Sequence, residues 1–204
     1  MEEKERVHLM KEFDLERKHK GYLAGVDEAG RGPLAGPVFA AAVVFSDDVV
    51  IEGINDSKKL TEKKREKLFD EICKKATAYC VASVDEKTID EINILQATFL
   101  AMRNAVAGLD ITPDYVLIDG NKSPGLPMEC ETVVKGDGKS MSIAAASILA
   151  KVSRDRFITE MAEIYPGYGF SKHKGYGTKA HYEAIEKLGI CPIHRKTFLR
   201  KLFK

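Results

Sequence analysis

Short apolar runs recur along the chain between charged segments, and they predict the strands of a sheet. Val38 to Phe45 is a continuous run rich in Val and Ala, which is typical of a strand buried on both faces. Leu23 to Val26 is a shorter run of the same kind. Further strands are predicted at Tyr79 to Val84, Tyr115 to Ile118 and Met128 to Val134.

Charged and apolar residues at helical spacing fill the intervening segments. Residues 3 to 19 are polar and predict an outer helix, and Thr61 to Ala76 opens on a threonine that can cap a helix. Ile89 to Leu109 follows a helical pattern as well. The longest predicted helix spans Ser140 to Ile164, and its first half, SIAAASILA, is apolar nearly all round. We therefore expect that half to be buried against the sheet.

This order of elements predicts an α/β fold with a mixed central sheet, flanking helices and a C-terminal helical part. The 204 residues suffice for one sizeable core. We expect residues 1 to 20 to form an N-terminal helical extension and residues 21 to 204 to form a single domain.

Composition narrows the class of protein. Hydrophobic residues make up 44% and charged residues 31%, as in a globular protein. The charged start, MEEKERVHLMKEF, has no signal-peptide core, and no stretch approaches the ~18 apolar residues of a membrane span. We expect a cytoplasmic protein without membrane contact. The cysteines lack zinc-ligand spacing and are expected to be reduced and mostly buried; they are Cys73, Cys80, Cys130 and Cys191.

The charge is unevenly distributed. The formal net charge is +1, yet Lys139 to Lys204 holds 13 Lys and Arg against 5 Asp and Glu, so this segment carries +8 and the preceding residues −7. A basic last third suggests a region that faces a polyanion. Two ordinary solvated faces would give the same count, so both interpretations stay open.

Four acidic residues stand beside predicted strands or the long helix. Asp27 and Glu28 follow the run LAGV, Asp119 follows YVLI, and Asp137 lies in KGDGKS ahead of the helix. A carboxylate next to buried structure is costly unless something compensates it. A hard cation with oxygen ligands compensates several at once, and two such ions ~4 Å apart support phosphodiester hydrolysis. Each acid alone could equally be a turn former or a helix cap.

The residues at this point resemble a known family. DEAGRGPLAGPV at Asp27 to Val38 resembles the signature of ribonuclease HII. Further blocks resemble the same family in the same order, and they cover the chain from about Gly21 to Phe198: NDSKKL, LIDG, KGDGKSMSIAAASILAKVSRD, HKGYGTKAH and PIHRKTF. The resemblance implies a ribonuclease H-like fold.

It also implies an activity. Asp27, Glu28, Asp119 and Asp137 would be catalytic carboxylates that bind Mn²⁺ or Mg²⁺. The substrates would be RNA/DNA hybrids and DNA duplexes with embedded ribonucleotides. Cleavage 5′ of the ribonucleotide by two metal ions would leave 3′-hydroxyl and 5′-phosphate ends. Nucleic acid is thus the expected partner, and we expect a monomer.

The segment Gly30, Arg31 and Gly32 is the candidate reader of the sugar. Glycines allow close approach of a backbone, and telling RNA from DNA requires contact with the 2′-hydroxyl. The resemblance assigns that task to this loop, whereas the pattern alone also fits a plain hairpin turn. Arg31 would distinguish the chain from ribonuclease HIII, which we expect to lack it and to carry an extra N-terminal domain.

Other residues are candidates for substrate binding. Tyr176 lies among cations, as in a nucleic-acid groove, and the resemblance implies that it packs on a deoxyribose; a core-edge tyrosine is the alternative. The remaining candidates are Lys58, Lys59, Ser140, His173 and Lys174. His194 and Arg195 are expected to tie the C-terminal helix to the body.

Two functions of other classes remain open from the sequence. One is a transposase- or resolvase-type nuclease with the same use of carboxylates, against which the glycine-arginine-glycine turn argues. The other is a non-catalytic nucleic-acid-binding module whose carboxylates are structural.

Overall fold

A five-stranded mixed sheet forms the centre of the molecule, in the order β3-β2-β1-β4-β5. The computed structural model describes residues 3–18, 21–200 and 202. β2 pairs antiparallel with both β1 and β3, whereas β4 runs parallel to β1 and β5. The predicted α/β class and mixed sheet are confirmed. The strands are β1 (Leu23–Ala29), β2 (Val38–Val44), β3 (Ala78–Val84), β4 (Tyr115–Asp119) and β5 (Glu129–Val133).

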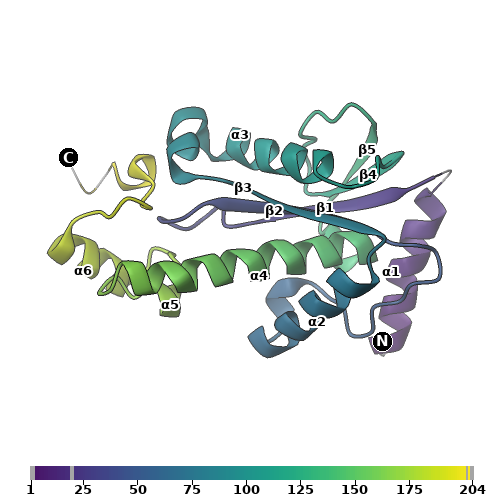
Figure 1. Cartoon of the computed structure of the whole chain (residues 1–204), viewed down its shortest axis with the longest axis horizontal. Coiled ribbons are helices and arrows are strands. Elements are labelled where there is room, and N and C mark those ends of the chain that lie inside the picture. Colours follow the sequence, from purple (N-terminus) through teal and green to yellow (C-terminus); the bar gives the residue numbers. More distant parts are fainter. Residues whose placement is uncertain (1–2, 19–20, 201, 203–204) are drawn as a thin grey trace.

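Helices cover both faces of the sheet (Figure 1). The helix α3 (Glu86–Ala107) lies on one face, and α4 (Met141–Ile164) runs along the other, with α1 (Glu3–Arg17) and α2 (Glu62–Lys75) beside it. The short C-terminal helices lie at the far end of α4. They are α5 (Phe170–His173) and α6 (Lys179–Leu188), and the 3-10 turns are η1 (Ser57–Lys59), η2 (Gly136–Gly138) and η3 (Lys196–Leu199).

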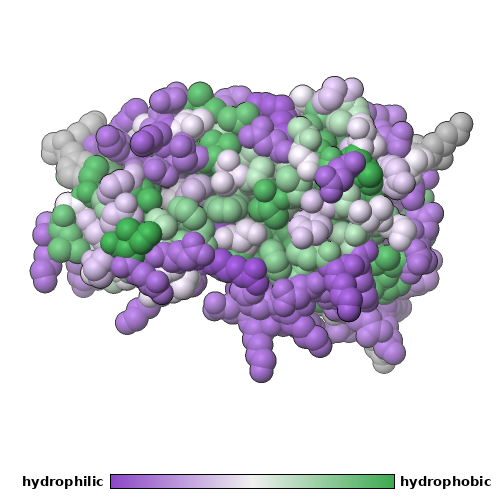
Figure 2. All heavy atoms as spheres, viewed as in Figure 1, coloured by the Kyte–Doolittle hydropathy of each residue, from purple (hydrophilic) through white to green (hydrophobic). Residues whose placement is uncertain are grey.

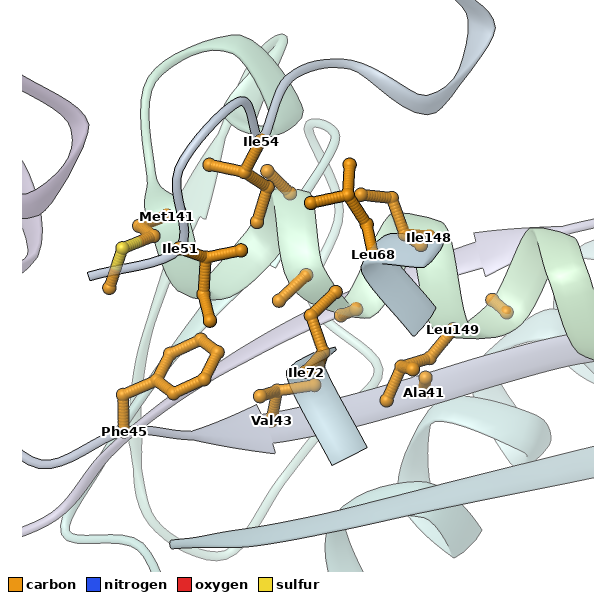
Figure 3. Packing of buried hydrophobic residues seen from close by; sticks show 14 of the residues in the cluster. Ala41, Val43, Phe45, Ile51, Ile54, Leu68, Ile72, Met141, Ile148 and Leu149 are labelled. Carbon is orange, nitrogen blue, oxygen red and sulfur yellow. The ribbon is translucent and has the colours of Figure 1, made fainter. Parts of the chain in front are cut away.

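The apolar first half of α4 is buried, as predicted, because it packs on β1 and β2. In Figure 3, residues of β2, α2 and α4 point into one shared cluster around Val43, Ile72 and Leu149. In the space-filling view, hydrophilic residues gather along the lower edge, while less polar residues form a band at the level of the sheet (Figure 2). Among the helices that the structure describes, none has the length and apolar character needed to cross a membrane.

The N-terminal helix is fixed to the start of α4. Val7 and Met10 enter the core cluster of β2, α2 and α4. Asp14 is buried, and its Oδ2 accepts hydrogen bonds of 2.9 Å from both the N–H and the hydroxyl of Ser142. The positive end of the α4 dipole also stabilises the Asp14 carboxylate at this position. The division of the chain into an extension and one domain stays a prediction.

Two expectations about position are corrected. Asp27 and Glu28 do not follow β1 but lie within it, because antiparallel pairing with Ala41 and Ala40 of β2 continues the strand to Ala29. The four cysteines are free, but only Cys191 is buried. Cys80 and Cys130 lie on β3 and β5, the outer strands of the sheet, where coverage is incomplete.

Histidines fill the core of the C-terminal part. The His181 Nε2 and His194 Nε2 atoms lie 3.1 Å apart, and His181 Nδ1 is 2.9 Å from the Tyr176 carbonyl oxygen. A carbonyl only accepts, so His181 Nδ1 carries a proton and its Nε2 accepts from His194. Burial lowers the pKa of His181 to about 4 and also lowers the pKa of His194. Both rings are therefore neutral at pH 7.

The neutral histidine pair predicts a pH dependence of stability. A folded-state pKa below the ordinary 6.5 gives stability that is present above pH 6.5 and is lost as the pH falls toward 4, at ~1.4 kcal/mol per pKa unit. His181→Asn keeps a donor near Nδ1 but does not titrate. In urea unfolding between pH 7.5 and 5, it should flatten the loss of stability.

His8→Asn is the matched control, because His8 lies on the exposed surface of α1. It should leave the slope of stability against pH close to that of the parent. An equal slope in the parent and His181→Asn would show that this pair does not set the pH dependence.

Candidate functional site

One cavity of about 210 Å³ brings together segments that are far apart in the sequence. The glycine turn after β1, the turn η1, the middle of α4 and the loop before α6 all contribute to its wall. The residues with side chains that chemistry could use are Asp27, Glu28, Arg31, Ser57, Lys58, Ser147, Lys151, Arg154 and Tyr176. Gly30 and Gly32 line the same cavity.

The parallel pairing of β1 and β4 brings acidic residues together. Val26 pairs with Ile118, so Asp27 and Asp119 come one step further along two adjacent parallel strands. Asp137 lies on η2, directly after β5 and before α4. The pKa of Asp27 is raised well above its usual range by burial and then by the charges of Glu28 and Asp119. The four predicted carboxylates therefore form one electrostatically coupled group.

Neighbouring polar groups hold these carboxylates. Asp27 Oδ1 accepts from the Glu28 N–H at 2.7 Å, and Asp119 Oδ1 accepts from the Gly136 N–H at 2.6 Å. Ser147 hydrogen-bonds Asp27 and lies 3.0 Å from the Ser57 hydroxyl oxygen. These contacts anchor the acids to β1, η1, η2 and α4.

Lys58 is the cation at the centre of the group. Partial burial disfavours its charged form, but the carboxylates of Asp137, Asp27, Asp56 and Asp119 outweigh that effect and raise its pKa. Burial, then the charge of Asp56, raises the pKa of Asp137 to about 6. Arg31 adds a second cation through its ion pair of 3.3 Å with Glu28. Two cations thus face several acids, which leaves the group with an excess of negative charge.

The donor chemistry fits a hard divalent cation. All the available ligands are carboxylate oxygens, which Mg²⁺ and Mn²⁺ accept. Within residues 3–18, 21–200 and 202, no three His, Cys, Asp or Glu side chains are already placed to hold a metal ion. Asp27 and Asp119 each use one carboxylate oxygen to accept from a backbone N–H group, which leaves the second oxygen of each for a cation. A bound cation would relieve the repulsion among these carboxylates.

The two glycines of the turn differ in their constraints. Gly30 has a φ of 96°, and a Cβ there would lie 2.2 Å from Arg154 Nε, so the backbone requires glycine. A Cβ on Gly32 would meet only the Tyr176 ring, at 3.6 Å. Gly32 and Tyr176, which is 45% exposed, line the same gap, and a Cβ on Gly32 would come into ordinary van der Waals contact with the ring.

Several predicted substrate contacts lie elsewhere. Ser140 is fully buried and caps α4 by accepting from the Ile143 N–H, so its assignment to substrate is corrected. His173 uses both ring nitrogens inside its own loop, with the Tyr168 carbonyl and the Gly175 N–H. The Lys174 ammonium donates to Thr159 at 2.9 Å. The Lys59 side chain is 66% exposed and does not line the cavity.

The sequence interpretation missed Asp56 and Arg154 and did not foresee which segment Arg195 binds. Asp56 caps η1 through the Lys58 N–H and adds a charge against Asp137. Arg154 and Arg195 are buried arginines that donate to backbone carbonyls. Asp56 carried a signal, since an acid two residues before Lys58 suits a capping position. The arginines carried no such signal, because each has a carbonyl partner more than a hundred residues away.

Comparisons with known proteins agree with the geometry. A model of the family described as Ribonuclease HII matches residues 24–204. Ribonuclease HII of Caldicellulosiruptor saccharolyticus is 60% identical over 94% of this chain and 96% of the relative. Ribonuclease HII of Clostridioides difficile is 55% identical over 98% and 79%, respectively. The solved ribonuclease H2 of Pyrococcus horikoshii has a TM-score of 0.74 at 32% identity, and the match covers 89% of this chain and 97% of that one.

The charge of Asp56 gives a testable consequence. Asp56→Asn removes a negative neighbour of Asp137, so the pKa of Asp137 should fall from about 6 by roughly one unit. Carboxyl ¹³C NMR titration of the metal-free protein measures it. Glu52→Gln, on the exposed loop before η1, is the control and should leave that pKa in place. An unchanged Asp137 pKa in Asp56→Asn would contradict the assigned cause.

Proposed function

We propose a reaction for this chain on the premise that it belongs to the ribonuclease HII family, whose model matches residues 24–204. Membership makes it a hydrolase of the ribonuclease H type. The finer proposal is that it cuts 5′ of a ribonucleotide, in RNA/DNA hybrids and in DNA duplexes with embedded ribonucleotides. The supporting observation is that Asp27, Glu28, the glycine turn and Tyr176 line one cavity. Asp119 and Asp137 lie outside that lining, but the charge of Asp119 acts on both Asp27 and Asp137.

The carboxylates supply the cutting side of the proposed site. Two Mn²⁺ or Mg²⁺ ions, when bound, would activate water and neutralise the departing 3′ oxygen. Asp27, Glu28, Asp119 and Asp137 would hold the ions and orient the attack. Lys58 already lies among these acids and is placed to attract the scissile phosphate. The products would be 3′-hydroxyl and 5′-phosphate ends.

The glycine turn supplies the side that recognises the ribose. Arg31 and Gly32 are exposed, and within the described part of the chain no acceptor takes the N–H of either residue. Two free donors beside the carboxylates can contact a 2′-hydroxyl, which accepts as well as donates. Across the gap, the exposed Tyr176 ring is placed to pack on the neighbouring deoxyribose.

The carboxylate assignment predicts loss of cleavage without loss of fold. Asp27→Asn and Asp119→Asn each remove a negative ligand, so cleavage of a duplex with one ribonucleotide should fall roughly a hundredfold or more. The assay compares Mn²⁺, Mg²⁺ and chelator and identifies the new ends. Asp48→Asn, at a fully exposed position, is the control. Normal turnover by either variant under saturating metal would refute the site.

The glycine turn predicts two different defects. Gly32→Val keeps an allowed backbone but fills the gap toward Tyr176, so it should reduce cleavage at a ribonucleotide at any salt concentration. Arg31→Ala removes a charge, and its defect should shrink as salt rises. Cleavage of ribo and 2′-methoxy duplexes at low and high salt separates the two. Gly32→Val activity equal to that of the parent would exclude this loop as the reader.

A further inference from the structure

We propose that Arg195 is the positioning residue that orients the glycine turn for sugar recognition. This inference rests on the proposed function of the turn and names the residue that shapes it. Arg195 is fully buried, with an exposed fraction of 0%. It lies more than 150 residues along the chain from the turn, yet among the described residues its side chain donates only to that turn and its continuation.

The guanidinium binds four backbone carbonyls at once. Its Nη2 donates to Gly30 at 2.6 Å, and its Nη1 donates to Arg31 and Pro33 at 2.9 Å each. Its Nε donates to Gly36 at 2.9 Å. The carbonyl oxygens from Gly30 to Gly36 that Arg195 holds therefore point inward, toward one planar cation.

The direction of these carbonyls leaves donors for a ligand. The N–H groups of Arg31 and Gly32 have no acceptor among residues 3–18, 21–200 and 202, and both residues are exposed. Arg195 holds the Gly30 and Arg31 carbonyls, and the N–H groups of Arg31 and Gly32 belong to the same two peptide groups, so these N–H groups point the other way, toward a sugar oxygen. Arg195 thereby sets which end of each peptide group the substrate meets.

The arginine and the turn depend on each other energetically. Burial, then the neighbouring charge of Arg154, lowers the pKa of Arg195 to about 9, which still leaves it charged at pH 7. Asp90 and Glu86 act on it only from a distance, so the carbonyls are its direct hydrogen-bond partners within the described residues. A buried charge is costly without such partners.

Two further contacts extend the arrangement to Tyr176. The Arg195 N–H donates to Leu34, and the Leu34 N–H donates to Gly175, each at 2.8 Å. Arg154 joins the same two segments by donating to Ala35 at 3.1 Å and to Lys174 at 3.0 Å. The position of the turn is therefore coupled to the position of the tyrosine ring across the gap.

Arg195→Lys is the direct test, since lysine keeps the charge but has one nitrogen in place of a planar fork. The readout is the ratio of Kd for an all-deoxy duplex to Kd for the same duplex with one ribonucleotide, measured with Mg²⁺ in an Asp119→Asn background. We expect this ratio to fall about tenfold, the worth of one well-placed hydrogen bond. The Kd for the all-deoxy duplex should stay unchanged.

Ile72→Ala is the matched control, because Ile72 is a buried core residue of α2 that does not line the cavity. It should lower the Tm and leave the ratio unchanged. If Arg195→Lys lowers the Tm and also leaves the ratio unchanged, its role is structural only and the inference is overturned. A ratio near one in the Asp119→Asn parent would instead overturn the proposed function of the turn, and this inference with it.

Phe198→Leu decides the matter if Arg195→Lys does not fold. The Phe198 ring centroid lies 5.1 Å from the guanidinium carbon, so its removal loosens the arginine without taking away its donors. We expect the ratio to fall about two- to threefold. A ratio equal to that of the Asp119→Asn parent would overturn the inference.

Discussion

Electrostatic repulsion at the ends of two parallel strands is the constraint on which the rest of this structure depends. The pairing of β1 with β4 places Asp27 and Asp119 on adjacent strands, and Asp27 is buried away from water. Raised carboxyl pKa values show that the arrangement is unfavourable without a cation. The rest of the fold holds it in place, since α4 is packed into the sheet and its start is tied to α1 through Asp14.

The same strand carries both halves of the proposed site. Asp27 lies within β1, and Gly30 comes directly after that strand, so a single rigid element sets the spacing between the carboxylates and the sugar reader. Such spacing would fix which phosphodiester bond is presented when a ribose occupies the turn. β1 cannot fix the turn beyond its own end, and there Arg195 supplies the order from the far end of the chain.

Local sequence patterns were enough for the fold and singled out acids that the structure couples electrostatically, but they did not show contacts between distant segments. Apolar runs predicted the positions of the strands. The apolar first half of α4 predicted that this helix packs against one face of the sheet. The pattern placed the end of β1 too early, because hydrogen bonding to the neighbouring strand β2 continues β1 past Asp27. Ser140 matched a family block and proved to be a helix cap, because matching a block does not say what a side chain touches. Arg195 was expected to tie the C-terminal helix to the body, but the sequence did not indicate that the part of the body it binds is the glycine turn.

The net charge of a sequence segment also differs from the charge that its surface presents to a ligand, because some charged residues are buried. The basic last third includes Arg154 and Arg195, both buried and both bonded to backbone carbonyls. Their charged groups hold the backbone carbonyls of two loops. They contribute little to the electrostatic field at the surface, because that field comes from solvent-facing groups. The attraction for nucleic acid must come from the lysines and arginines that face solvent, such as Arg31 and Arg156. In this chain the buried arginines act through shape: they determine which polar groups of the backbone a substrate can reach.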